Sequence, residues 1–293
     1  MRQVFAAHLN RNVVVGGCQL TYEHPKGVLF LRDVRDKVAK LASPGSIAWN
    51  NAAAMQVITN ILGNADYGDC VEAEEGHFIG LVTANGKGLF SYTPTLVLAM
   101  YSALTSPPFN PTTGANDNGT DPVTCLNYFL TNPYADGTKN SAYLIVDATN
   151  QPEIQYALAT FGNLKLWLAL PDGYVNPIPS ANGFVWDVAS PNPDQGHCIG
   201  GCGYLTAGAP VPQSVQVLGV TALGIVIMTW GLVGTLTWAA AAQLCIPANG
   251  GGMAVRVTAD WLNANGTSPT GLALTALLAD LAALGTPVTP PSS

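Results

Sequence analysis

Apolar residues recur at helical spacing through much of the first half of the chain. Two proline positions strengthen this pattern: Thr93-Pro94 and Asp121-Pro122 each place proline at a first helical position, where the amide that proline lacks would be unpaired anyway. Asp69 and Glu72 have the spacing of a capping box at the start of a further helix. The pattern predicts helices over residues 51–61, 70–82, 94–104, 122–130 and 152–161.

Short apolar runs bounded by turn residues dominate the second half. They predict strands over residues 142–146, 164–170 and 253–258, and another that begins near Gly196. Thr237 has the position of a cap for a short alanine-rich helix through Leu244.

The stretch from Gln195 to Val255 contains no Asp, Glu, Lys or Arg, and its part from 215 to 242 is apolar enough to suggest a membrane span. Glycines interrupt it, however, and its β-branched runs are short. We therefore favour two buried strands, over residues 215–221 and 225–229, that are joined by a turn. We expect no contact with a membrane.

Helices early and strands late predict an α+β fold, with an N-terminal helical layer packed on a C-terminal antiparallel β-sheet or barrel. We divide the chain into an N-terminal arm or subdomain (1–60), a main domain (61–285) and a C-terminal tail (286–293). Leucines at helical spacing over residues 274–284 predict a last helix with one packing face.

Charged residues make up 10% of the chain and hydrophobic residues 48%, so much of the surface is uncharged and suits an assembly. The net charge of −7 argues against binding to nucleic acid, because phosphate contacts need clustered Lys and Arg. Seven of the eleven basic residues lie in the first 40 positions. This basic segment is either an arm that meets an acidic neighbour, such as another copy of the chain, or an ordinary solvated face.

Six scattered cysteines do not resemble a disulfide framework, and we interpret them as reduced thiols. The N-terminus lacks the apolar core of a signal peptide, so we expect no secretion by that route. A zinc site at His197, Cys198 and Cys202 is disfavoured, because successive residues of a strand point to opposite faces. We expect no metal and no cofactor.

Candidate chemistry comes from two segments that lie 127 positions apart. Cys70 follows Gly-Asp at a predicted helix start, and His197 follows glycine on a predicted strand. A helix N-terminus and a neighbouring imidazolium both lower the pKa of a thiol, whereas a carboxylate such as that of Glu72 opposes ionisation. The order of these residues favours nucleophilic catalysis by Cys70 with His197 as its base.

These motifs resemble those of papain-like cysteine peptidases. That family carries a glutamine six positions before its cysteine, whose side-chain amide helps to hold the oxyanion, and Asn64 stands at that position here. The family follows its histidine strand with Asn-Ser-Trp-Gly, where this chain has Met-Thr-Trp-Gly at 228–231. The resemblance implies a papain-like fold over about residues 60–285, with Cys70, His197 and Asn64 as catalytic residues.

One position departs from the family pattern. The family's asparagine orients the histidine ring, but Met228 at that position offers only a weakly accepting sulfur. Thr229 or Asp194 could take over this role, or Cys70 and His197 work as a dyad. The wider order of motifs resembles papain-like proteins that phages and prophages encode, which implies a location in the virion or the host cytoplasm.

Two functions follow from these observations. The first is a cysteine hydrolase that acts on a peptide, isopeptide or related amide. The second is a non-catalytic virion structural or decoration protein that keeps the fold for assembly, with further copies of the chain or other virion proteins as partners.

Overall fold

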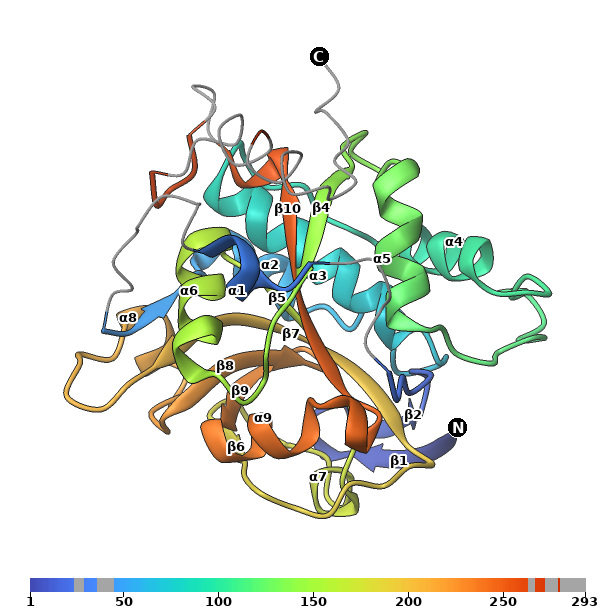
Figure 1. Ribbon diagram of the computed structural model, residues 1–293. Helices are drawn as coiled ribbons and strands as arrows, with labels where there is room; N and C mark the ends of the chain where they lie inside the picture. The colour runs from blue at the N-terminus through green and yellow to red at the C-terminus, as the bar shows by residue number, and fades with distance from the viewer. Residues whose placement is uncertain (24–28, 36–44, 263–266, 272–278, 280–293) are drawn as a thin grey trace.

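The computed structural model describes residues 1–23, 29–35, 45–262, 267–271 and 279. Residue 279 apart, the leucine-rich helix predicted near the C-terminus and the tail at 286–293 lie outside this part. The described residues fold around one large sheet with helices on both faces (Figure 1). This arrangement agrees with the predicted α+β class.

The large sheet has eight strands, and seven of them follow one another side by side. Their order is β4 (Asn140–Ile145), β10 (Gly252–Thr258), β5 (Leu164–Ala169), β7 (Gly196–Leu205), β8 (Gly224–Thr229), β9 (Leu232–Thr237) and β6 (Phe184–Trp186). The eighth strand, β3 (Ile47–Ala48), pairs with β7 off this path.

Two details of the predicted sheet are wrong. The described strands form an open sheet rather than a barrel, because the end strands β4 and β6 do not pair with each other. The sheet is also not wholly antiparallel, since β6 enters it parallel to β9.

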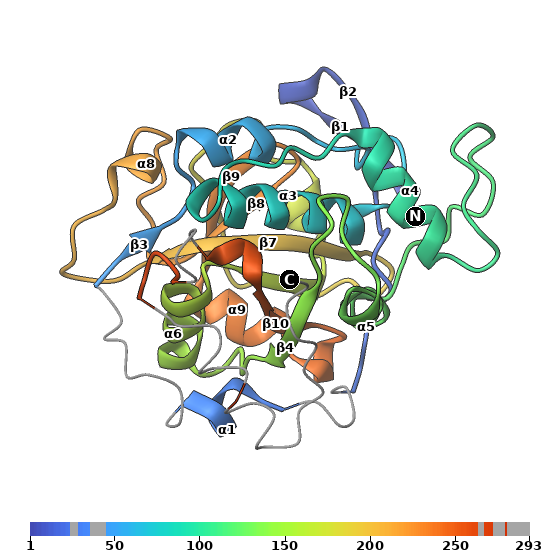
Figure 2. The same cartoon turned by 90° about the horizontal axis from the view of Figure 1, so that it is seen from above.

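Helices cover both faces of the sheet. The helix α3 (Cys70–Asn85) lies along one face beside α2 (Ala52–Ile58), while α6 (Gln151–Phe161) and α9 (Trp238–Leu244) lie on the other (Figure 2). Further helices are α4 (Pro94–Leu104) and α5 (Pro122–Thr131) beside α3, and the short α1 (Leu31–Arg35), α7 (Asp172–Val175) and α8 (Gln213–Gln216). Three single-turn 3₁₀ helices complete the set at Ala7–Leu9, Pro247–Asn249 and Ala259–Trp261.

Local caps account for the helices that the sequence predicts well. The side chains of Thr93, Asp121 and Thr237 each accept a hydrogen bond from a backbone amide of the first turn, which begins α4, α5 and α9 where the sequence predicts.

The predicted strand over residues 215–221 is wrong. Residues 213–216 form α8 and turns follow to 223, so β8 pairs with β9 instead. Trp230 and Gly231, with φ of 49° and 76°, make the two-residue turn between them, which needs positive φ at both positions. Among the described residues, no helix has the length and apolar character that crossing a membrane requires.

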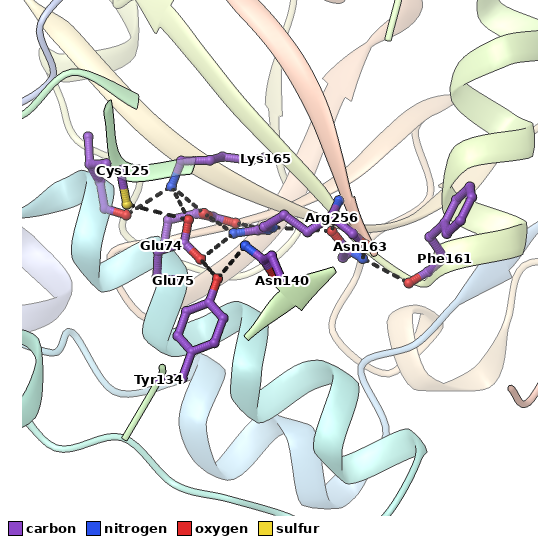
Figure 3. Close-up of polar contacts among 10 residues, drawn as sticks. Glu74, Glu75, Cys125, Tyr134, Asn140, Phe161, Asn163, Lys165 and Arg256 are labelled. Atoms are coloured by element: carbon purple, nitrogen blue, oxygen red, sulfur yellow. Dashed lines mark hydrogen bonds and ion pairs between the residues drawn. The ribbon is translucent and has the colours of Figure 1, made fainter. Parts of the chain in front are cut away.

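A buried ion network fixes α3 against the sheet (Figure 3). Glu74 and Glu75 on α3 pair with Lys165 of β5 and Arg256 of β10, over N–O distances of 2.7 to 2.9 Å. All four side chains are at most 1% exposed. Tyr134 donates a further hydrogen bond of 2.8 Å to Glu75. Because both strands hold the same two carboxylates, the network sets where the start of α3 lies over β5 and β10.

The first residues form a hairpin of β1 (Arg2–Ala6) and β2 (Arg11–Val15). Residues 16–21, here called the N-terminal strap, continue from β2 and contact the loops before α3 and α5 and the start of β7. The strap bonds to the loop before α5 through the amide of Gln19 and the carbonyl of Gly17, both paired with the backbone of Thr120. It bonds to the sheet side through the amide of Cys18, which donates to the carbonyl of Gly196 over 3.1 Å.

Candidate active site

Cys70 is the first residue of α3 and lines a narrow pocket of about 10 Å³, enough for roughly one water molecule. The same pocket is lined by Asn64 from the loop before α3 and by Thr229 from the end of β8. Leu62 and Gly63, with φ of 58° and 102°, give that loop its sharp turn just before Asn64. The structure therefore brings three of the five predicted site residues to one pocket.

His197 lies on β7 next to this pocket but does not line it. Its Nε2 atom is 2.9 Å from Oγ1 of Thr229, and its ring stacks on Trp230, with centroids 4.5 Å apart. Thr229 and Trp230 both line the pocket of Cys70. Nδ1 of His197 has no hydrogen-bond partner among the described residues, and the side chain is 1% exposed. Cys198 lines the pocket, and successive residues of a strand point to opposite faces, so the His197 side chain points away from the thiol and contacts Thr229 and Trp230 of the pocket lining.

The two candidates for orienting His197 lie in different surroundings. Thr229 contacts the ring, and its hydroxyl can accept a hydrogen bond from Nε2–H, which leaves Nδ1 as the basic nitrogen. Asp194 is exposed, and its backbone amide donates to the side chain of Asn192. Met228 lies on the face of the sheet towards α3, where its side chain meets Gly200.

Both members of the candidate pair are uncharged in this arrangement. Burial raises the pKa of the Cys70 thiol well above its ordinary value, and the Cys198 and Glu72 side chains raise it further, against a smaller opposing effect of the Cys198 backbone amide. Burial lowers the pKa of His197 to about 3. The lowered thiol pKa expected from the helix N-terminus and an imidazolium is therefore wrong for this state, because desolvation of both groups outweighs the helix dipole.

Asp69 and Glu72 are buried carboxyl groups with no completed hydrogen bond among the described residues. Burial raises the pKa of Glu72 to about 8, although the Thr120 hydroxyl, which faces it without completing a hydrogen bond, and Lys165 oppose this. Burial and then Glu72 also raise the pKa of Asp69. The predicted capping box is wrong, because Asp69 occupies the N-cap position but its side chain accepts no bond from the helix amides.

The N-terminal strap passes beside Cys70. Cys18 is 5% exposed and belongs to the same buried cluster as Cys70 and Cys198. The backbone of Gly17 packs directly on Gly68, which stands two residues before Cys70. No side-chain pattern predicts this contact, and its local signal in the sequence is the consecutive pair Gly16-Gly17.

A second pocket of about 230 Å³ lies at the other end of the strap. It is lined by Gln19 and by both ends of the loop from Thr105 to Thr120. The strap therefore passes a narrow pocket at Cys70 and a roomier one at Gln19.

No known protein-family model matches the sequence, and no curated protein matches it. Solved structures do match. The chain resembles xylellain, a cysteine protease from Xylella fastidiosa, with a TM-score of 0.54 and 11% identity over 83% of this chain and 97% of that one. It resembles the proform of the ragweed pollen allergen Amb a 11, a cysteine protease, with a TM-score of 0.52 and 10% identity over 81% and 71% of the two chains.

Procathepsin B S9 from Trypanosoma congolense has the same TM-score of 0.52, with 10% identity over 82% of this chain and 85% of that one. At such identities the likeness shows the fold alone. The chain has a papain-like α+β fold.

Proposed function

We propose that the protein is a cysteine hydrolase that acts on a peptide or a related amide bond. One observation carries the proposal: within a papain-like fold, the thiol of Cys70 shares a pocket with the amide of Asn64 and with Thr229, which holds His197. Nucleophile, oxyanion donor and oriented base are the three parts that acyl transfer by a thiol needs.

The proposed reaction requires His197, which does not contact Cys70 in this state, to move to the thiol when the strap is displaced. Sγ of Cys70 then attacks the carbonyl carbon of the substrate and its proton passes to Nδ1 of His197. The oxyanion is held by the side-chain amide of Asn64 and by backbone amides at the start of α3, which have no acceptor within the helix. His197 then gives the proton to the leaving amine, and water hydrolyses the thioester. Thr229 keeps the ring in place by accepting from Nε2–H.

In this proposal the substrate occupies the groove between Gly68, Gly119 and Gly196 that the strap fills in this state, so the strap leaves it first. Its departure would bring water to Cys70 and His197, remove much of the burial that keeps both uncharged, and so favour the thiolate and imidazolium. We therefore expect low activity in the state described above and higher activity when the strap is displaced.

A peptidyl epoxide tests this proposal, because it alkylates an activated thiol in preference to ordinary ones. All six cysteines are buried in this state. We expect mass spectrometry to find the label on Cys70 when the strap is displaced, rather than on the other five cysteines. His197→Ala should slow the labelling. Slow and equal labelling of several cysteines would count against catalysis.

A second candidate is a virion structural or decoration protein without activity. The deep burial of the thiol and the imidazole, 3% and 1% exposed, favours it. The order of motifs and the low charge support a phage origin and association with virion proteins or further copies of the chain. Quantitative mass spectrometry of purified particles should then find the chain at a fixed stoichiometry, and its absence from particles, with a monodisperse monomer in solution, would contradict this role.

A further inference from the structure

Four glycines meet where the strap passes Cys70. Gly17 belongs to the strap, and the others come from three different walls: Gly68 from the loop before α3, Gly119 from the loop before α5, and Gly196 from the start of β7. The four lie far apart in the sequence. The main chain of the strap is therefore enclosed by the main chain of its neighbours.

The space at Gly17 has no room for a side chain. A Cβ atom added there would lie 2.4 Å from both Cα and the carbonyl oxygen of Gly68, which are backbone atoms and cannot turn aside. The wall formed by Gly119 is also close to the strap. A Cβ added to Gly119 would lie 2.2 Å from the carbonyl oxygen of Gly17. Only glycine fits between these two walls.

The next two strap positions differ from this one. The Cys18 side chain is buried in the cluster with Cys70 and Cys198, so this position takes a small side chain. The Gln19 side chain lines the 230 Å³ pocket, and its amide donates to the carbonyl of Gly119 over 3.2 Å. A long polar side chain therefore fits at this position.

Backbone hydrogen bonds on both sides hold the strap without regard to its side chains. Thr120 donates to the carbonyl of Gly17 and accepts from the amide of Gln19, both over 3.0 Å, and Gly196 accepts from the amide of Cys18. Such bonds supply affinity for any extended chain, while the space at each position supplies selectivity. The strap shows what kind of chain the groove holds.

We infer that this groove is a binding site for an extended peptide with glycine at the position of Gly17, a small residue after it and a longer polar residue next. The strap is its occupant within the same chain. If the bound peptide is also the substrate of Cys70, the inference rests on the proposed hydrolase function. The binding preference by itself does not depend on that function.

Peptide binding tests it directly. The protein carries Gly17→Ala, which sets a Cβ against Gly68 and loosens the strap, together with Cys70→Ala, which prevents turnover. The probe is a fluorescent peptide with the sequence of residues 13–21 and serine in place of its cysteine. A matched peptide has alanine in place of the second glycine. We expect fluorescence anisotropy to show at least tenfold tighter binding of the glycine peptide.

Gly173→Ala with Cys70→Ala is the matched control, because a Cβ at Gly173 meets no atom within 4 Å and the strap stays in place. This control should bind the glycine peptide at least tenfold more weakly than the Gly17→Ala protein. Circular dichroism establishes that both variants are folded. Equal affinity for the two peptides, or binding of neither peptide to a folded Gly17→Ala variant, would overturn the inference.

The two proposals fail in different ways. Selective binding of the glycine peptide without cleavage by the Gly17→Ala protein that retains Cys70 would remove the hydrolase function and leave the binding preference. Cleavage of both peptides at equal rates would remove the preference and leave the hydrolase.

Discussion

The first turns of α3 carry two pairs of buried carboxyl groups that differ in their surroundings. Glu74 and Glu75 are fully paired with Lys165 and Arg256, whereas Asp69 and Glu72, on either side of Cys70, complete no hydrogen bond among the described residues. Although burial alone would raise the pKa of Glu75, Arg256 and Lys165 hold it at about 2. Burial raises that of Glu72 to about 8.

Within one helix, the paired and the unpaired carboxyl groups therefore differ in what they contribute to stability. A buried charge that is paired can anchor an element, and an unpaired carboxyl group in the same helix costs stability unless it stays protonated. The unpaired groups flank Cys70 in the chain, and Glu72 faces Thr120, whose backbone binds the strap, although the paired Glu74 also lines the pocket of Cys70. We interpret the paired half as the anchor and the unpaired half as the working end.

Removing the anchor should have the largest effect. Arg256→Met leaves two buried carboxylates with Lys165 alone, and breaking a buried pair in this way costs about 3–5 kcal/mol of unfolding free energy. Urea unfolding measures the loss. Arg11→Met is the control, because the side chains of its ion pair with Asp66 are 48% and 52% exposed, and we expect a change below about 1 kcal/mol there. Similar small losses in both variants would show that the network is not an anchor.

Glu72→Gln should stabilise the protein at neutral and higher pH. Because the pKa of Glu72 is raised to about 8, the folded state resists the ionisation that the unfolded chain undergoes near its ordinary value of 4.5. Stability is therefore fully present below pH 4.5 and is lost as the pH rises towards 8. With about 1.4 kcal/mol per pKa unit, the variant should gain about 3 kcal/mol at pH 7 and little at pH 4.

Unfolding free energies of both proteins between pH 4 and pH 8 check this result, with Glu23→Gln as an exposed control. A gain that is constant with pH would mean that Glu72 is not protonated in the folded protein.

The titration of His197 should lower the unfolding free energy at acidic pH, and by less than the titration of Glu72 does at neutral pH. Its pKa is lowered to about 3, so the unfolded chain takes up a proton first, and stability is lost as the pH falls from 6.5 towards 3. At pH 5 this costs about 2 kcal/mol. His197→Phe retains an aromatic ring to stack on Trp230 and has no titrating group. The loss between pH 7 and pH 5 should be smaller in this variant by about that amount, and parallel curves would contradict the assignment.

The sequence predicts those parts of the fold that local signals determine. Caps at Thr93, Asp121 and Thr237 begin helices where expected, because a cap acts within four residues. The ion network could not be foreseen in the same way, since Glu74 meets Arg256 across 182 positions. Its one signal is a lone basic residue in each of two apolar strands, which indicates a buried partner.

At the site, the order of motifs predicts which residues line one pocket, but it does not predict their protonation states. Asn64, Cys70 and Thr229, which the sequence predicts as site residues, line one pocket. The neutral state of Cys70 and His197 follows from their burial, which motif spacing does not report. The position of the strap could not be predicted from the sequence, because backbone hydrogen bonds hold it and these do not depend on the side-chain pattern.

Under the proposed function, Cys70 and His197 form a catalytic pair once the strap leaves. The pH dependence of Cys70 alkylation by iodoacetamide, followed by mass spectrometry, tests it most directly. In the Gly17→Ala variant we expect the rate to rise through an inflection well below the ordinary thiol value of about 8.5, and His197→Phe in that background should remove this shift. An inflection at or above the ordinary value, unchanged by His197→Phe, would contradict the claim.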